Sequence, residues 1–297
     1  MTDPDLTDRL RNLPAPPAAM ATIIQSAGNP AVKLVDLASL IEAEPTFTAQ
    51  LLGMANAAGG AKVQIRTVRQ AAVSLGARTL RNQAVAHVVR VTGRRLQPGD
   101  LDVDMFWEDC LRRAVAAKVL AEASGFEDPA EAFTVGLIQD LGTLMLAALY
   151  PDRCDGFQEA TRLPARQRAK FEHSRFGMYH ATLFGRVGQL WRLPDDLCAA
   201  VRFHHRPKEI KGDRRLVQLC QIAHAADAVS DVFQASGAGA SLLLAQSAVK
   251  NLGGRTPIDI EEICASVRAE LPVFAAERTL KHHAAARWTS RSVSSTR

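Results

Sequence analysis

Apolar residues recur at helical spacing along almost the whole chain, and this periodicity constrains the fold more than any other feature. Three of the clearest runs are Leu34, Leu37, Ala38 and Ile41; Phe47, Leu51, Met54 and Ala55; and Leu80, Ala84, Val88 and Val91. This spacing places the apolar side chains on one face of an α-helix. No convincing alternation of polar and apolar residues, the pattern of a half-buried strand, competes with it. The sequence therefore predicts an all-α protein.

The composition supports the same fold class. Apolar residues make up 47% of the chain but aromatic residues only 5%, so the apolar mass is mainly Ala, Leu and Val. These residues favour packed helices over a β-sandwich. A chain of 297 residues is long enough to bury a sizeable core, which excludes intrinsic disorder for most of it.

The net charge of +5 is concentrated at the C-terminus. Residues 277–297 contain one anion, Glu277, and five cations, which gives this stretch a net charge of +4. The cations are Arg278, Lys281, Arg287, Arg291 and Arg297. The rest of the chain is nearly neutral, and a basic tail does not make a basic domain, so the charge argues against nucleic acid as a partner. Residues 287–297 are polar and lack periodicity, which predicts a disordered tail.

Several features predict a cytoplasmic protein without a membrane segment. The N-terminus has no signal-peptide pattern, and the five cysteines are widely spaced without a CxxC pair, which fits a reducing compartment. The best membrane candidate is the apolar segment Ala132 to Tyr150, but Gln139 and Asp140 lie at its centre. An aspartate there costs about 3 kcal/mol on insertion scales, so we interpret the segment as one buried helix.

Local signals mark individual helix starts. The segment Asp128-Pro129-Ala130-Glu131 predicts a helix start, with Asp128 as the N-cap, Pro129 at the first helical position and Glu131 as the capping-box glutamate. Pro45 predicts two helices between Leu34 and Asn56, which could form a DNA-binding helix-turn-helix. The second of these helices contains no Arg or Lys, so it has little with which to contact phosphates or guanine edges.

Two loop-like stretches suggest how the chain is divided. Residues 93–102 combine Gly, Pro and charge between helical regions, and residues 235–240 form a second weak point. We expect a lead-in over 1–12, an N-terminal helical lobe over 13–98, a second helical lobe over 99–234, a C-terminal helical extension over 235–286 and the tail over 287–297.

Asp140 is the polar residue most in need of a partner, because the surrounding helix is apolar nearly all round. A buried carboxylate requires a cation, several donors or a metal ion. His180, His204, His205 and Asp227 could join it at a metal, whereas the structural alternative is a carboxylate that caps a helix or pairs with an arginine. His204 and His205 are adjacent and would point about 100° apart on a helix, so we expect that they do not bind one ion together.

Other enzyme classes lack their minimal motifs. The chain has no GxSxG, no Walker-type glycine loop and no GxGxxG after a strand, which leaves a metal phosphohydrolase or no enzyme. Clustered arginines leave a third possibility open, a module that binds nucleotides or nucleic acid through phosphates, although the same arginines could form a solvated helix face. These arginines are Arg78, Arg81, Arg94, Arg95, Arg112 and Arg113.

The order of short motifs between Leu13 and Val229 resembles the HDOD proteins, a bacterial group of helical regulatory proteins. That group is related to HD-type metal phosphohydrolases and to the HD-GYP cyclic-di-GMP phosphodiesterases. Each motif is weak alone, but the order is specific. The motifs are Leu13–Pro17, Leu37–Pro45, Leu51–Asn56, Ala71–Gly76, Phe106–Trp107, Gly136–Gly142, Trp191–Pro194 and His204–His205.

The resemblance implies two helical lobes, of which the second is a degenerate HD-type domain. The HD metal set is a histidine on an early helix, a His-Asp doublet and a later aspartate; here these positions match Asp109, Gln139-Asp140 and Asp227. Two imidazoles are therefore missing. His180 and one of His204 and His205 match accessory histidines of the HD-GYP relatives, whereas the GYP segment is replaced by Arg206-Pro207-Lys208.

The sequence thus predicts a non-catalytic regulatory protein that contacts a bacterial signalling protein and needs no cofactor. A homodimer is compatible with its helical surfaces. The alternative is a phosphohydrolase with an eroded site for a divalent metal such as Fe, Mn, Mg or Zn. The candidate ligands of that site are Asp109, Asp140, His180, His204, His205 and Asp227.

Overall fold

A computed structural model describes residues 6–29, 31–58, 64–96, 98–234, 238–252 and 258–272. Across these ranges the regular structure is helical and no strand is present, which confirms the all-α prediction. The predicted tail at 287–297 lies outside the described residues. The α-helices are α1 (Leu6–Arg11), α2 (Ala18–Gly28), α3 (Leu34–Glu42), α4 (Pro45–Ala58), α5 (Val68–Gly93), α6 (Val103–Ser124), α7 (Pro129–Ile138), α8 (Leu141–Leu149), α9 (Phe157–Ala160), α10 (Ala165–Phe176), α11 (His180–Leu190), α12 (Asp195–Phe203), α13 (Arg214–Gln234) and α14 (Ala238–Lys250).

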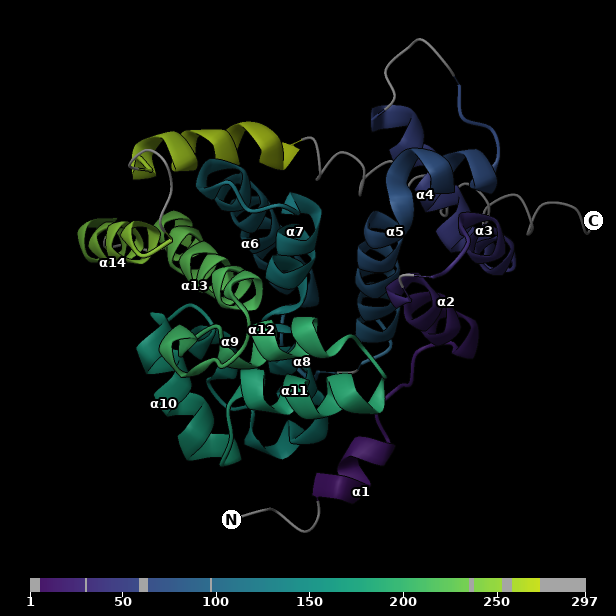
Figure 1. The fold of residues 1–297 in the computed structure, drawn as a ribbon. Helices are drawn as coiled ribbons and strands as arrows, with labels where there is room; N and C mark the ends of the chain where they lie inside the picture. The colour runs from purple at the N-terminus through teal and green to yellow at the C-terminus, as the bar shows by residue number, and fades with distance from the viewer. Residues whose placement is uncertain are drawn as a thin grey trace, which may run out of the picture.

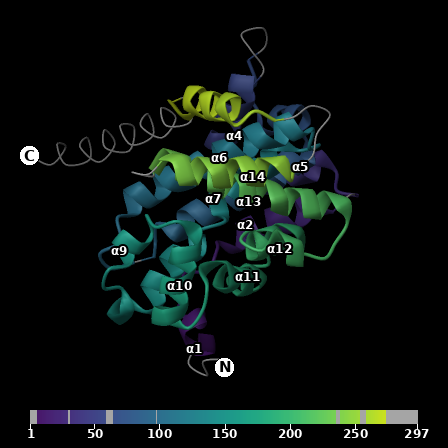
Figure 2. The same cartoon turned by 90° about the vertical axis from the view of Figure 1, so that its left-hand side faces the viewer.

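Shorter elements complete the chain. Two 3-10 turns, η2 (Pro151–Arg153) and η3 (Pro207–Glu209), connect longer helices, and residues 260–272 are also helical. In Figure 1, α2 to α5 lie on the right, α8 to α12 lie at the lower left and centre, and α6, α7 and α13 lie above α8 to α12. α14 packs on α13, as the view turned by 90° also shows (Figure 2).

Several helices begin where the sequence predicts. α4 starts at Pro45, and its buried residues Phe47 and Leu51 pack into the core. α7 starts at Pro129, and the Asp128 side chain accepts a hydrogen bond from the Glu131 N–H. The predicted capping box is wrong in one respect: the Glu131 side chain binds two arginines instead of returning to the cap.

The prediction of one helix from Ala132 to Tyr150 is also wrong, because the chain turns at Gln139 and Asp140. Asp140 has φ −102° and ψ 6°, and its carbonyl accepts a hydrogen bond from the Thr143 N–H at 2.8 Å, a three-residue turn that starts α8. Just after the turn, a Cβ on Gly142 would lie 2.1 Å from the His180 carbonyl oxygen. The break and this glycine let α11 approach α8 closely.

The same apolar stretch, Pro129–Leu149, is long and apolar enough by composition to cross a membrane. However, 83% of its most apolar window is buried inside the fold. A core helix of a soluble protein has these properties, because side chains buried on all sides need no polar face.

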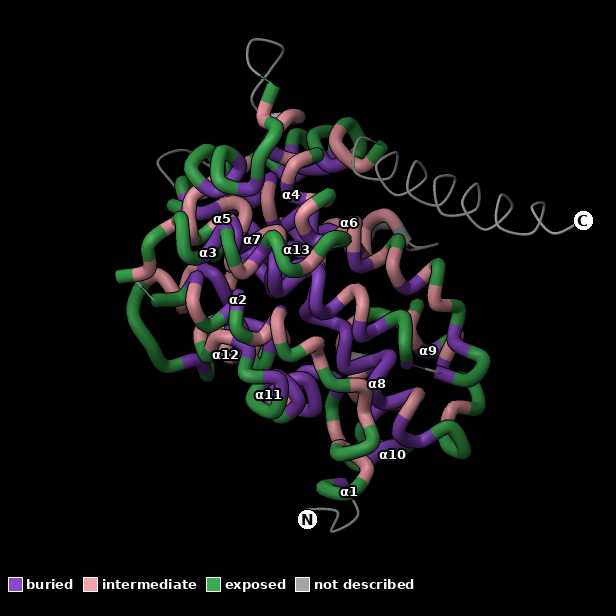
Figure 3. Tube along the Cα trace, turned by 90° about the vertical axis from the view of Figure 1, so that its right-hand side faces the viewer, coloured by how far each residue is buried: buried purple, intermediate pink, exposed green. Residues whose placement is uncertain are grey.

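The apolar core is continuous across the boundary predicted near residue 98. One cluster of buried residues extends from Leu6 in α1 to Val267 in the last described helix. The buried segments, drawn in purple, run from α5 across α7 and α13 toward α8 (Figure 3). The stretch between α5 and α6 is a connection, as predicted, but Leu96 and Leu101 within it are buried. The division into lobes stays a prediction.

Candidate functional site

Four titratable side chains meet where helices of the second half of the chain end or begin. Asp140 lies at the turn between α7 and α8, His180 is the first residue of α11, and His204 and His205 directly follow α12. One ligand atom from each residue lies within 4.8 Å of the others. The structure therefore brings together four of the six candidate ligands.

Asp140 Oδ1 lies at the centre of this cluster. It is 3.4 Å from His180 Nε2 and 3.5 Å from His204 Nε2. The Nε2 atom of His205 lies 3.2 Å from that of His180. Asp140 Oδ1 and His204 Nε2 are buried and have no regular hydrogen-bond partner among the described residues. An oxygen and a nitrogen in this situation are potential metal ligands.

The outer nitrogens of two histidines are fixed by further hydrogen bonds. Glu172 of α10 lies 2.7 Å from His180 Nδ1 and also accepts a hydrogen bond from the His180 N–H. His204 Nδ1 donates to the Val201 carbonyl at 2.6 Å, which leaves Nε2 as the ring nitrogen that faces the cluster. Such partners are typical of histidines that bind metals, because they fix the tautomer and the ring orientation.

The expectation that His204 and His205 point apart is wrong. α12 ends at Phe203, so neither histidine lies within the helix on which the 100° argument rested. Their ring centroids are 3.8 Å apart, and both rings face the cluster.

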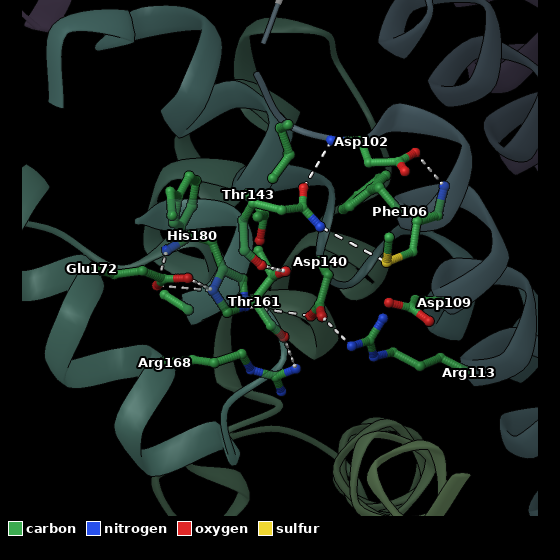
Figure 4. A pocket seen from close by; sticks show the side chains of 15 residues that line it. Asp102, Phe106, Asp109, Arg113, Asp140, Thr143, Thr161, Arg168, Glu172 and His180 are labelled. Atoms are coloured by element: carbon green, nitrogen blue, oxygen red, sulfur yellow. Dashed lines mark hydrogen bonds and ion pairs between the residues drawn. The ribbon is translucent and has the colours of Figure 1, made fainter. Parts of the chain in front are cut away.

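An arginine bridges the two aspartates that the HD pattern assigns to a metal. Arg113 of α6 is 3% exposed, and its Nη2 lies 3.0 Å from Asp140 Oδ2. Its Nε donates to Asp227 Oδ1, also at 3.0 Å. Figure 4 shows Arg113 and Asp140 pointing toward one another, with Glu172 and His180 paired on the other side of Asp140. A guanidinium group therefore supplies positive charge between the two carboxylates.

A second buried arginine completes the pairing of Asp227. Arg168 of α10 donates to both oxygens of Asp227 at 3.0 Å. Asp227 is 2% exposed, so its charge is held by these two arginines rather than by water. His205 Nδ1 is 3.6 Å from Asp227 Oδ2, which is too long for a good hydrogen bond.

Burial and these charges shift several pKa values in opposite directions. Burial alone would raise the pKa of Asp140, but Arg113 and the two histidines outweigh it and hold the pKa well below its ordinary value. Burial would lower the pKa of His180, but Glu172 and Asp140 raise it to about 10. Burial and the charge of His204 lower the pKa of His205. The ionised state of Asp140 is thus favoured by a cation that belongs to the chain itself.

The HD-pattern residues Asp109 and Gln139 lie outside the cluster. Asp109 pairs with Arg112 of its own helix at 2.7 Å and lines a pocket beside Asp140. Gln139 is fully buried, and neither side-chain amide atom has a hydrogen-bond partner among the described residues. Of the four HD-pattern positions, only Asp140 therefore contributes to the cluster.

The pocket beside Asp140 has a cavity of about 20 Å³, room for little more than one water molecule. Its walls combine apolar side chains of α6 and α9, such as Phe106 and Phe157, with Arg113, Arg168 and four carboxylates. The carboxylates belong to Asp102, Asp109, Asp140 and Glu172. Because the two arginines are already paired with aspartates, this lining offers little free positive charge to a phosphate group.

Several arginines that could have bound phosphates are used inside the fold. Arg78 pairs with Glu127 at 3.0 Å, and Arg81 pairs with Glu131 at 3.2 Å. Arg112 and Arg113 pair with carboxylates of the site region, whereas Arg94 and Arg95 are exposed directly after α5. These ion pairs argue against the nucleotide or nucleic-acid alternative.

Sequence reasoning missed the site roles of Arg113, Arg168 and Glu172. Arg113 was grouped with possible phosphate ligands, although it lies four residues after Asp109 and therefore on the same side of that helix. Arg168 and Glu172 have the same four-residue spacing on α10, but nothing in the local sequence shows which face of α10 is buried.

Comparison with known proteins identifies the fold. The profile of the HDOD domain family matches residues 13–207. An HDOD domain protein of unknown function from Geobacter sulfurreducens superposes with a TM-score of 0.68 at 20% identity, covering 92% of this chain and 97% of that one. A Shewanella amazonensis protein, named provisionally as a phosphohydrolase, gives a TM-score of 0.67 at 21% identity, covering 91% and 95%.

A curated relative extends beyond the matched region. An uncharacterized protein of Treponema pallidum (strain Nichols) is 26% identical over 215 residues, which is 69% of this chain and 41% of that protein. The chain thus matches less than half of the length of this relative.

Proposed function

Because the chain belongs to the HDOD family, we propose that it is a non-catalytic regulatory protein of the cytoplasm that acts through contacts with a bacterial signalling protein. The observation that carries this proposal is the Arg113 guanidinium between Asp140 and Asp227. In the HD pattern these two aspartates hold a metal. Here the permanently charged guanidinium group of Arg113 supplies the positive charge between the two aspartates.

This substitution removes what hydrolysis requires. Metal-assisted hydrolysis needs a fixed ion with an open position for water. A guanidinium group has donors but no acceptor and cannot bind and activate a water as a Lewis acid does. The amide of Gln139 at the doublet is also a poor ligand for transition metals compared with an imidazole. We therefore expect that the region around Asp140 contacts a signalling protein and does not catalyse hydrolysis.

The test is a hydrolysis assay on protein purified without chelator and then supplied with Mn²⁺, Mg²⁺, Fe²⁺ or Zn²⁺. We expect no cleavage of cyclic dinucleotides or nucleotides above the level of the Asp140→Ala variant. Cleavage by the wild-type protein that the Asp140→Ala substitution abolishes would contradict the proposal.

A second candidate function is supported by the unpartnered atoms of the four-residue cluster. Asp140, His180, His204 and His205 could hold one divalent transition metal, and Glu172 and the Val201 carbonyl orient two of the imidazoles. When bound, the ion would supply Lewis-acid activation of a water or a phosphate oxygen. The pocket beside Asp140 would then be the place where a water molecule reaches the ion.

Metal content measured by elemental mass spectrometry separates the two candidates. About one Zn, Fe or Mn ion per chain, lost in His204→Gln and retained in His173→Gln, would favour the second candidate, because His173 is exposed and outside the cluster. Folded, metal-free wild-type protein would favour the first.

A further inference from the structure

A network of ion pairs holds the first turns of three helices that lead to the candidate site. Its centre is Glu131 in the first turn of α7, whose side chain is fully buried. One carboxylate oxygen of Glu131 lies 3.2 Å from Arg81 Nη2 of α5, and the other binds Arg215 at the start of α13. Asp196 in the first turn of α12 joins the network, 3.3 Å from Arg81 Nη2.

A residue of the candidate site lies within or just after each of the helices α7, α12 and α13. α7 leads to Asp140, α12 leads to His204, and α13 carries Asp227. At a rise of about 1.5 Å per residue, the site residues lie roughly 12 to 18 Å along the helices from the network. Helices bend only gently over such lengths, so a shift of a first turn is carried to the site.

Arg81 is the contact through which the N-terminal helices reach Glu131. It belongs to α5, and its side chain is only 16% exposed. Water cannot replace it, because Glu131 is fully buried and relies on Arg81 and Arg215 for compensation of its charge. Among the described residues, Arg78, a second arginine of α5, pairs with Glu127 and Asp128 at the more exposed edge of the network, where Glu127 also binds Arg215.

We infer that Arg81, Glu131 and Arg215 form an ionic latch through which α5 positions the helices that carry Asp140, His204 and Asp227. The N-terminal helices and the candidate site are then conformationally coupled, and Arg81 is a positioning residue. Coupling of this kind is reciprocal, so a partner bound at either region changes the other. The inference does not depend on whether the site binds a metal.

The experiment is NMR of the full chain with ¹⁵N-labelled histidine, comparing wild type with Arg81→Met. We expect the ring signals of His180, His204 and His205 to shift, while the signal of the exposed His173 stays in place. Arg78→Met is the matched control, since it removes a guanidinium of the same helix that does not touch Glu131; it should leave the site histidines unchanged. Circular dichroism checks that each variant is folded.

Each outcome is decisive. Site-histidine signals that coincide in Arg81→Met and wild type would overturn the inference, even if the melting temperature falls, because Arg81 would then be structural only. Equal shifts in Arg78→Met would also overturn it, because the effect would not pass through Glu131. If Arg81→Met does not fold, the double variant Arg81→Met/Glu131→Met removes both charges together, and the same shifts of the site histidines are expected.

Discussion

The N-terminal helices α2 to α4 and the helices around the site bury very different residues. The residues described as buried in α2 and α3 are apolar, as are Phe47, Leu51 and Ala55 of α4. Helices α6 to α13 bury Arg113, Glu131, Asp140, Arg168, Glu172, His180, His204 and Asp227. Both regions share one continuous apolar core. The two regions therefore differ in how substitutions affect the free energy of unfolding. In the apolar region the loss grows with the side-chain volume removed, whereas near the site the removal of one charge leaves a buried partner charge unpaired.

The largest effect is expected from Arg113→Ala. The substitution leaves Asp140 and Asp227 without their shared cation, and breaking a buried pair in this way costs about 3–5 kcal/mol. Urea unfolding measures the loss. Arg112→Ala is the matched control, because Arg112 is the neighbouring residue but is 20% exposed and pairs only with Asp109; we expect a loss below about 1 kcal/mol. Similar losses in both variants would show that the burial of the ion pair does not set the cost of breaking it.

Leu80→Ala, measured in the same assay, tests the apolar core that α5 shares with α2 to α4. Leu80 of α5 is fully buried, and removal of a buried leucine side chain costs about 3 kcal/mol, depending on how far the cavity collapses. Leu190→Ala, at a leucine that is 58% exposed, should change the free energy of unfolding by no more than about 0.5 kcal/mol. A near-zero effect at Leu80 would mean that the core around α5 is not closely packed.

The charged region should also make stability depend on pH through Asp231. Burial and the carboxylates of Asp227 and Asp140 raise its pKa to about 7, against the opposing effect of Arg168 and Arg113. Because this pKa is above its unfolded value, the folded state binds more protons between about pH 4 and pH 7, and stability falls as the pH rises through that window. Between pH 5 and pH 8 we expect this group to lower the free energy of unfolding by about 3 kcal/mol, a change that is absent in Asp231→Asn. Unfolding curves at pH 5 and pH 8 check this, and the same pH dependence in the variant would contradict it.

The smallest effect is expected at a helix cap. The Thr67 hydroxyl accepts a hydrogen bond from the Gln70 N–H, and the Thr67 N–H donates one to the Gln70 side-chain oxygen, so Thr67→Ala should cost about 1 kcal/mol. Thr22→Ala is the control, because the Thr22 hydroxyl only donates to a carbonyl one turn back in an exposed part of α2. Thermal unfolding distinguishes the two variants, and equal melting temperatures would show that the cap does not limit stability.

Features that depend on neighbouring residues can be predicted from the amino-acid sequence. Apolar periodicity predicts the all-α class, Pro45 and the Asp128-Pro129 pair predict helix starts, and the order of motifs indicates the HDOD family. These signals can be read because helix formation and capping involve residues within about four positions of each other.

The assembly of the site depends on contacts between helices that are distant in the sequence. Arg113 and Asp227 are 114 residues apart in the chain, and no local pattern indicates that they pair. The turn at Asp140 and the position of His204 and His205 beyond α12 depend in the same way on contacts with distant helices. A buried charge takes its partner from whichever helix the packing brings near, so its identity is set by the fold and not by the neighbouring sequence.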